Sequence, residues 1–303
     1  MNIKSVRHYL ELLQMRQDYS AGCTVCEICQ SSDAEILLPI IHGPQNKLVA
    51  LPVMGCRECG HIYQLYRFEY NFYQDYYDKF YRLNLFGNTE PDEYFFRDQI
   101  KRGDYLYKNL QQYLPEKGVL IDVGCSAGGL MIPFARRGWR VTGNDPDSAY
   151  ASYGKKLGLI IDTVSAEEMT VSEPANLIII NGSLEHVYDV NQVMAKCRTV
   201  AAPEGLLLIE GRALGYGMQQ GYLTHNHRRF LTPHSIELLM LKHGWMPILT
   251  TEMPLCGPTR PGAVFVLARA GQVDVQDFER VQALGQTALR ERYQPWFTTT
   301  GAA

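Results

Sequence analysis

Short apolar runs alternate with amphipathic stretches from about residue 118 onward. The apolar runs are Val119–Val123, Arg140–Gly143, Leu159–Thr163, Leu177–Ile180, Leu206–Ile209, Pro247–Thr251 and Ala263–Ala268. Helical spacing predicts helices between them at Leu130–Arg137, Ser148–Leu157, Val190–Val200 and Ser235–His243. This alternation is typical of an α/β fold with a mostly parallel sheet. Ile178–Ile180 and Leu206–Ile209 are near-continuous apolar runs, which indicates strands covered on both faces.

Composition and charge are those of an ordinary globular protein. The chain has 303 residues, of which 46% are hydrophobic and 20% are charged, and its net charge is −3. The length predicts one large domain with a smaller one, and the charge gives no electrostatic case for a nucleic-acid partner. No run approaches the roughly 18 apolar residues of a membrane span, and the N-terminus lacks a secretory apolar stretch. We therefore expect a cytoplasmic chain without a membrane partner.

Two C-x-x-C pairs lie within the first sixty residues, Cys26 with Cys29 and Cys56 with Cys59. In a reducing compartment such pairs indicate a metal before a disulfide, and four thiolates suit tetrahedral Zn²⁺. We expect a structural zinc ion on these four residues. Cys23 leaves an alternative open, because it has the same spacing to Cys26 and could replace Cys29.

A small-residue loop follows the first predicted strand, with Asp122, Gly124, Ser126 and Gly128. Small residues at a strand end let the backbone approach a ligand closely. Asp145 ends the next predicted strand, at roughly the 20-residue offset of nucleotide-binding α/β folds, where a carboxylate can accept hydrogen bonds from ribose hydroxyls. A third apolar strand ends in the polar stretch Asn-Gly-Ser-Leu-Glu-His at 181–186.

In this order, the three features resemble the class I S-adenosylmethionine-dependent methyltransferases. That family carries the motifs D-x-G-C-G-x-G, G-x-D-x-S/D and L-E-H-V, and the matching stretches here are 122–128, 143–147 and 184–187. The resemblance continues through 203–209 and 227–235 and covers about residues 95–270. It implies a Rossmann-like, seven-stranded methyltransferase sheet with S-adenosylmethionine as the cofactor.

The resemblance also implies roles for individual residues. The loop around the methionine moiety would hold Asp122, Gly124, Cys125, Ser126 and Gly128, and the ribose would lie at Asp145 and Pro146. Ala166 and Glu167 would flank the adenine, and the sulfonium would lie near Asn181, Gly182 and Ser183. Ser126 stands where the family usually has glycine, which could narrow the loop.

The cysteine pairs, a tyrosine-rich stretch and the methyltransferase core together resemble bacterial sugar and natural-product methyltransferases. Members that methylate carbon atoms of nucleotide-linked deoxysugars carry a Y-H-E-H motif, and here Thr224, His225, Asn226 and His227 occupy it. The acidic partner of the histidines is missing, which argues against C-methylation. We favour O-methylation, with N- and C-methylation as alternatives. Methylation of a hydroxyl needs a base, and histidine is suited to that near neutral pH.

The candidate bases are His186, His225 and His227. Each has a plainer interpretation as a structural or solvated loop residue. Tyr76, Tyr77 and Tyr81 either line the acceptor pocket or pack between domains.

We therefore expect methyl transfer to a small-molecule acceptor, namely a sugar, a polysaccharide precursor or a secondary metabolite. One alternative is a nucleic-acid methyltransferase that uses the zinc module for binding, which the acidic net charge disfavours. Another is a non-catalytic scaffold that binds S-adenosylmethionine. The oligomeric state stays open between monomer and homodimer.

Four segments are expected along the chain. They are a zinc-binding module at 1–66, a tyrosine-rich helical linker or acceptor lid at 67–115, the methyltransferase domain at 116–272 and a helical tail at 273–303. Within the tail, charged residues at helical spacing predict an exposed helix over Asp274–Tyr293.

Overall fold

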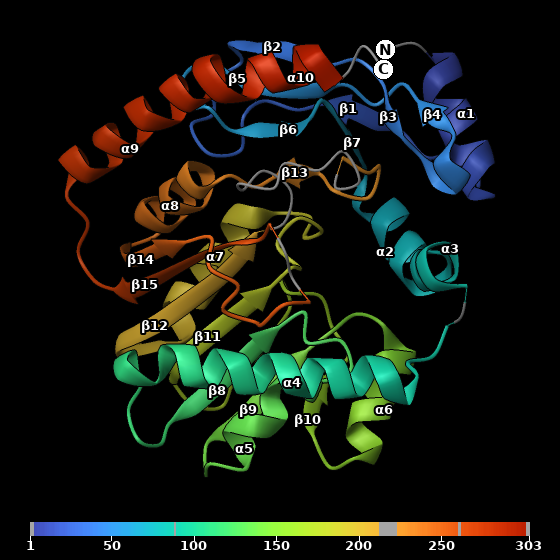
Figure 1. Cartoon of the computed structure of the whole chain (residues 1–303). Coiled ribbons are helices and arrows are strands. Elements are labelled where there is room, and N and C mark those ends of the chain that lie inside the picture. The colour runs from blue at the N-terminus through green and yellow to red at the C-terminus, as the bar shows by residue number, and fades with distance from the viewer. Residues whose placement is uncertain (1–2, 88, 212–222, 260–261, 301–303) are drawn as a thin grey trace.

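A seven-stranded sheet forms the centre of the computed structural model, which describes residues 3–87, 89–211, 223–259 and 262–300 (Figure 1). Its strands are β8 (Val119–Val123), β9 (Arg140–Asn144), β10 (Ile160–Asp162), β11 (Ala175–Asn181), β12 (Ala201–Gly211), β14 (Trp245–Thr251) and β15 (Val264–Ala270). Their order is β10-β9-β8-β11-β12-β15-β14. Only β15 runs antiparallel to its neighbours among these strands. The seven predicted apolar runs are these seven strands, so the predicted fold class is confirmed.

Helices cover both faces of this sheet. They are α4 (Glu93–Leu110), α5 (Ile132–Ala135), α6 (Ser148–Lys156), α7 (Val190–Val200) and α8 (Pro233–Lys242). Along β11, Ile178 and Ile180 join the core beneath α7 and α8, whereas Leu177 and Ile179 join the core beneath α4 and α5. Successive side chains of a strand point to opposite faces, so one apolar run serves two cores. Each such buried side chain contributes roughly 1.5–3 kcal/mol to folding.

A smaller sheet forms the N-terminal module, and its order is β13-β6-β5-β2. The elements of this module are α1 (Ile3–Leu13), β1 (Ala21–Cys23), β2 (Ala34–Leu38), β3 (Ile41–His42), β4 (Leu48–Val49), β5 (Val53–Cys56), β6 (Ile62–Gln64) and β7 (Tyr66–Phe68). Its edge strand β13 (Arg229–Phe230) comes from far along the chain, beyond the fifth strand of the large sheet. The module is therefore completed by a segment from the part of the chain that forms the large sheet.

The tyrosine-rich stretch is helical, as predicted, and forms α2 (Tyr70–Lys79), α3 (Tyr81–Phe86) and α4. Asp92 caps α4 by accepting a hydrogen bond from the N–H of Phe95. Figure 1 shows α2 and α3 on the side of the molecule where the N-terminal module approaches the large sheet. The two short helices are thus placed beside the loops that follow the parallel strands.

The C-terminal tail is helical but is not exposed on all sides. It forms α9 (Val275–Ala288), a short π-helical turn and α10 (Gln294–Thr300). Val281, Leu289 and Tyr293 are buried, and Figure 1 shows α9 and α10 lying along the N-terminal module. Gly60 and Gly285 lie so close that a Cβ on Gly60 would be 2.1 Å from the carbonyl oxygen of Gly285. The prediction of an exposed tail is wrong for this face, because a charged pattern on one side of a helix does not reveal a partner on the other.

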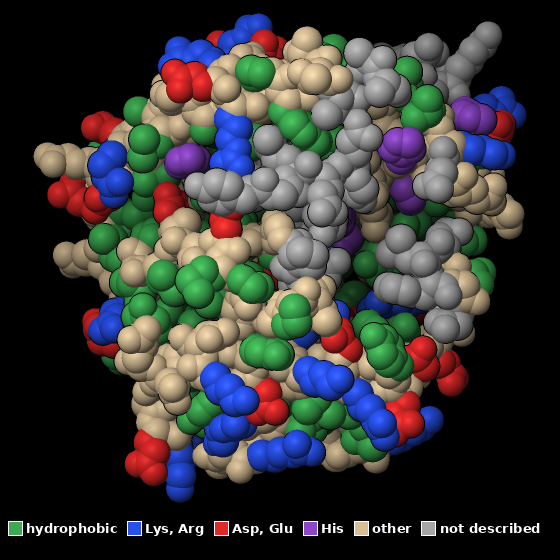
Figure 2. Space-filling model, in the orientation of Figure 1, with side chains coloured by type: hydrophobic (Ala, Val, Ile, Leu, Met, Phe, Trp, Pro, Cys, Tyr) green, Lys and Arg blue, Asp and Glu red, His purple; other side chains and the backbone are tan. Residues whose placement is uncertain are grey.

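The surface of the described residues mixes charges of both signs. Figure 2 shows basic and acidic side chains side by side over α4, where Arg97 pairs with Glu93 and Arg102 pairs with Asp98. Among the residues that the structure describes, no helix has the length and apolar character that a bilayer span requires.

Candidate active site

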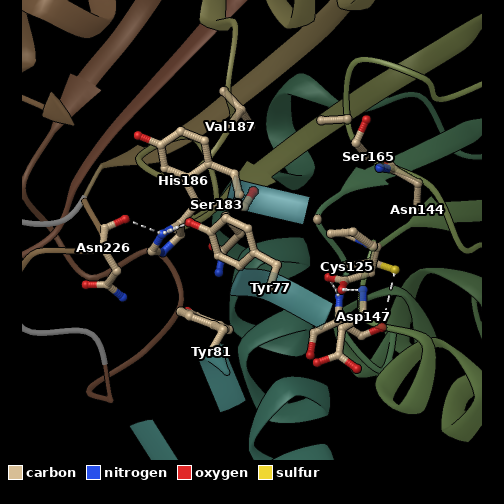
Figure 3. A pocket seen from close by; sticks show the side chains of 18 of the residues that line it. Tyr77, Tyr81, Cys125, Asn144, Asp147, Ser165, Ser183, His186, Val187 and Asn226 are labelled. Atoms are coloured by element: carbon tan, nitrogen blue, oxygen red, sulfur yellow. Dashed lines mark hydrogen bonds between the residues drawn. The ribbon is translucent and has the colours of Figure 1, made fainter. Parts of the chain in front are cut away.

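A cavity of about 800 Å³ opens at the carboxyl ends of β8, β9 and β11. Figure 3 shows side chains from these strand ends facing side chains from α2, α3 and the loop before β13. Every predicted cofactor residue except Gly128 lines it. Carboxyl ends of parallel strands meet at one edge of a sheet, which explains why residues far apart in sequence share this cavity.

The loop after β8 is shaped for close approach of a ligand. Gly124 has φ +73°, and a Cβ there would lie 2.6 Å from the Cβ of Ser183. Ser183 is itself held in place, because its hydroxyl donates to the carbonyl of Val123 at 2.8 Å. Glycine is therefore required at 124 by both its backbone conformation and the narrow space. This narrow cradle of small residues fits the cofactor that the motifs imply.

Ser126 occupies a left-handed conformation with φ +57°, the kind of position that favours glycine. Its N–H donates to Asp145 at 2.7 Å, and its hydroxyl accepts a hydrogen bond of 3.2 Å from Arg82. The serine thus ties the loop to α3. Arg82 also donates to the Asp147 carboxylate at 3.1 Å and stacks 3.9 Å from the ring centroid of Tyr150.

Two buried carboxyl groups, Asp122 and Asp145, lie at the base of the cavity. Burial, together with the charge of Asp145, raises the pKa of Asp122 to about 7. Burial also raises the pKa of Asp145, although Arg82 and hydrogen bonds from the N–H groups of Asp147 and Ser126 partly oppose the shift. A bound cation would favour the ionised form of both groups.

The predicted adenine and sulfonium residues also line the cavity. Glu167 accepts hydrogen bonds from the N–H groups of Tyr188 at 2.7 Å and Asp189 at 3.0 Å. It therefore holds the loop that carries His186 as well as forming part of the wall. Asn181 accepts a hydrogen bond from the thiol of Cys256 at 3.0 Å.

His186 lies on the opposite wall from the cofactor loop, next to Tyr77 and Asn226 (Figure 3). Its Nδ1 is 3.1 Å from the backbone carbonyl of Asn226 and 3.1 Å from the hydroxyl of Tyr77. A carbonyl can only accept, so the neutral ring carries its proton on Nδ1. This tautomer leaves the lone pair on Nε2, and that nitrogen is the one able to accept a proton.

The other two histidines of the predicted motif take different positions. His227 lines the cavity, with its ring centroid 4.9 Å from that of His186. His225 does not line it: its Nδ1 lies 2.9 Å from the hydroxyl of Tyr9 on α1. Burial and the neighbouring His227 lower the pKa of His225 to about 3, so its ring is neutral. This geometry removes His225 from the candidate bases, because its side chain turns toward α1 whereas Thr224, Asn226 and His227 line the cavity.

The predicted tyrosines divide in the same way. Tyr77 and Tyr81 line the cavity, whereas Tyr76 is buried in the core of the N-terminal module. Tyr70, Tyr73 and Tyr188 line the cavity as well, although no periodic pattern in the sequence indicates them. The acceptor side of the cavity is therefore mainly aromatic, with polar hydroxyl groups.

The four cysteines of the two C-x-x-C pairs gather at one point of the N-terminal module. Their sulfur atoms all lie within 4.8 Å of one another. The Sγ atoms of Cys26 and Cys59 are 3.5 Å apart, and those of Cys29 and Cys56 are also 3.5 Å apart. Four thiolates at Zn–S distances of about 2.3 Å would be roughly 3.8 Å apart in a tetrahedron. The donor set fits zinc, and Cys23 is exposed and lies outside this cluster.

Glu27, inside the first cysteine pair, joins the module to the cavity wall. Its carboxylate pairs with the buried Arg229 and lies 2.7 Å from Arg67 and 3.4 Å from His61. Burial alone would raise the pKa of Glu27, but Arg229, His61 and Arg67 lower it well below its usual value. Arg229 also donates to the carbonyls of Leu184 and, at 2.9 Å, Val187, on either side of His186. Sequence reasoning missed this link, although Glu27 and Arg229 both lie inside predicted motifs.

Comparisons with known proteins identify the family of this chain. A family model described as a methyltransferase domain matches residues 95–249, which is more than half of the chain. The ubiquinone biosynthesis O-methyltransferase of Rhodopseudomonas palustris is 34% identical over 96 residues, which is 30% of this chain and 38% of that protein. The enzyme of the same name from Nitrobacter winogradskyi is 31% identical over 136 residues, which is 39% of this chain and 52% of that protein. The chain thus spans about half or less of the length of these two relatives.

Solved structures match with lower identity. The 1,6-didemethyltoxoflavin N1-methyltransferase of Burkholderia thailandensis is 18% identical, with a TM-score of 0.44, over 58% of this chain and 79% of that one. The glycopeptide N-methyltransferase MtfA, solved with S-adenosylmethionine, is 14% identical, with a TM-score of 0.45, over 57% of this chain and 94% of that one. The match of the family model to residues 95–249 is the finding that decides the family. The chain belongs to the methyltransferase-domain family, the class I S-adenosylmethionine-dependent methyltransferases that its motifs resemble.

Proposed function

We propose that this protein transfers a methyl group from S-adenosylmethionine to an oxygen atom of a small-molecule acceptor. The observation that carries the proposal is one cavity with the cofactor loop on one wall and His186, His227 and a group of tyrosines on the other. Curated relatives that match part of the chain are named O-methyltransferases, which agrees with an oxygen acceptor. A sugar, a polysaccharide precursor or another secondary metabolite fits an aromatic wall with hydroxyl groups.

S-adenosylmethionine supplies a methyl group on a positively charged sulfur. Asp122 and Asp145 provide negative charge on the cofactor side, and Gly124 leaves room for the backbone to approach. His186 accepts the acceptor's proton at Nε2, since Asn226 and Tyr77 hold the ring through Nδ1. Positioning of the two reactants supplies much of the acceleration, about 7–11 kcal/mol in well-oriented systems.

Zinc on Cys26, Cys29, Cys56 and Cys59 is the second part of the proposal. The ion is structural, because four thiolates complete its coordination and leave no open position for a substrate. Its part is to hold the segment that carries Glu27, and through Arg229 the loop around His186.

Calorimetric titration of the purified chain tests the cofactor site. We expect S-adenosylmethionine and S-adenosylhomocysteine to bind, and Gly124→Ala to weaken both by about tenfold or more, because the new Cβ would meet Ser183. Gly158→Ala is the matched control, since Gly158 also has a positive φ but has nothing within 4 Å of an added Cβ. If the wild-type chain bound neither compound, the proposed methyl transfer would be contradicted, and only the methyltransferase fold would stand.

Turnover measurements on a histidine variant test whether His186 is the base. His186→Ala is expected to keep cofactor binding and to lose about 10²–10⁴-fold in turnover on an accepted hydroxyl compound, found by screening sugars and phenols. His243→Ala, outside the cavity, should retain turnover. Unchanged turnover of His186→Ala would contradict the assignment of the base.

A further inference from the structure

Arg228 lies in the wall of the cavity as a buried cation, and no carboxylate among the described residues pairs with it. It is 4% exposed and lines the cavity. Its Nε and Nη1 have no hydrogen-bond partner among the described residues. Its guanidinium instead lies 3.5 Å from the ring centroid of Tyr73 and 5.6 Å from that of Tyr188. Buried charges in proteins are usually paired, so this arrangement points to a partner from outside the chain.

Glu27, the acid paired with the neighbouring Arg229, is already engaged. Glu27 pairs with Arg229 and Arg67 in the next layer of the wall. Burial lowers the pKa of Arg228, and Arg229 and Arg67 lower it further, whereas Tyr73 and Tyr77 oppose this effect. The stretch 212–222, outside the described residues, contains no aspartate or glutamate in its sequence. A carboxylate from this part of the chain is therefore not a source of the missing charge.

The backbone fixes Arg228 in this position. Its N–H donates to the carbonyl of Glu185 at 3.1 Å, and its carbonyl accepts from the N–H of Gln64 at 2.9 Å. Glu185 directly precedes His186, so the guanidinium and the proposed base are held by the same short loop. Tyr77, whose hydroxyl forms a hydrogen bond with His186, is also close enough to Arg228 to raise the pKa of its guanidinium.

We propose that Arg228 binds an anionic group of the acceptor, a carboxylate or a phosphate, and so selects acidic small molecules. This rests on the proposed methyl transfer in the same cavity. A guanidinium presents a planar fork of N–H groups that matches either anion. Arg82 also lines the cavity, on the cofactor side, but its guanidinium already pairs with the carboxylate of Asp147. The anion would anchor the acceptor at Arg228 while its hydroxyl lies at His186.

Anion binding by Arg228 is tested with matched charged and neutral probes. The probes are added to the chain after it has been saturated with S-adenosylhomocysteine. The probes are 4-hydroxybenzoate with its uncharged amide, and 4-hydroxyphenyl phosphate with hydroquinone, each titrated by calorimetry. We expect at least one anion to bind about tenfold or more tightly than its neutral counterpart. Arg228→Gln should weaken that anion by about 10- to 100-fold and leave the neutral probe unchanged. The pair with the larger difference distinguishes a carboxylate from a phosphate acceptor.

Controls separate this proposal from the proposed function. Arg137→Gln removes another arginine stacked on a tyrosine, Tyr107, but outside the cavity, and should leave anion binding unchanged. Binding of S-adenosylhomocysteine to Arg228→Gln reports that the variant is folded, and Arg228→Lys should restore part of the anion binding. Equal binding of charged and neutral probes to the wild-type chain, or unchanged anion binding in a folded Arg228→Gln, would overturn the proposal. Loss of cofactor binding by the wild-type chain would instead overturn the proposed function.

Discussion

Asp122 is a carboxyl group whose burial opposes its ionisation. Its pKa of about 7 in the folded chain lies above the ordinary value of 3.8. The folded state therefore holds its proton more tightly than the unfolded state does. Stability from this group is fully present at low pH and is lost as the pH rises towards 7. A cationic cofactor beside the carboxylate would reverse part of this loss.

We expect Asp122→Asn to stabilise the cofactor-free protein at high pH. Relative to the wild type, its free energy of unfolding should rise by about 2–3 kcal/mol between pH 5 and pH 8, because the variant carries no buried charge there. Urea denaturation across this pH range measures the difference. Asp33→Asn, at an exposed ion pair, is the control and should show little pH-dependent change. A pH-independent difference for Asp122→Asn would contradict the raised pKa.

Residues at strand ends could be predicted from the sequence, whereas residues that meet across elements could not. Asp122, Asp145 and Asn181 end apolar runs, and parallel strands bring such ends together. Arg82 enters the cavity from α3 through packing between distant segments, and no spacing in the sequence indicates such a contact. Arg228 was adjacent to a predicted histidine, but its burial and lack of a partner appear only in three dimensions.

At the scale of elements, β13 connects the small sheet with the active-site loop. Phe230 pairs with Ile62 and Arg229 pairs with Tyr63 across the two strands. The prediction from sequence covered the seven long strands but not β13, because a two-residue strand carries no alternation to recognise. The buried ion pair of Arg229 with Glu27 adds a charged contact at the same place.

Glu27→Gln should destabilise the protein strongly. Arg229 has no exposed side-chain surface, so removing its charged partner leaves a buried cation, at a cost of about 3–5 kcal/mol. Chemical denaturation provides the measurement. Glu93→Gln breaks an exposed pair with Arg97 and should cost less than about 1 kcal/mol. Equal losses in the two variants would mean that the buried pair does not support the fold as argued.

At the scale of the whole molecule, two later helices, α8 and α9, hold the N-terminal module through hydrogen bonds. Lys242 of α8 donates to the carbonyls of Glu27 at 3.2 Å and Ile28 at 2.8 Å. Gln282 and Gln286 of α9 donate to the carbonyl of Glu58 at 2.8 and 2.7 Å. Both cysteine pairs therefore lie beneath contacts made by later parts of the chain. The boundaries at 66 and 272 stay predictions, and these contacts of α8 and α9 cross them.

Removal of metal from the proposed zinc site should loosen more than the cysteine loops. We expect a chelator to increase amide hydrogen exchange in β6, β13 and α9 by about tenfold or more, since these elements pack on the cysteine segment. Exchange in β9 and β10, at the far edge of the large sheet, is the internal control. Unchanged exchange in α9 after verified metal loss would contradict a structural zinc ion.

The contact between Glu58 and α9 also determines the order in which the N-terminal module is completed during translation. Its partner Gln282 lies 224 residues further along the chain, which corresponds to roughly 10–45 s of translation at about 5–20 residues per second. All four cysteines leave the ribosome near the beginning of this interval, whereas β13 and α9 arrive towards its end. The thiolates are thus open to the solvent, and to zinc, before their covering elements exist. Once α9 is in place, Gln282 and Gln286 hold the carbonyl of Glu58 inside the second cysteine pair, so the proposed zinc ion would bind before this helix docks.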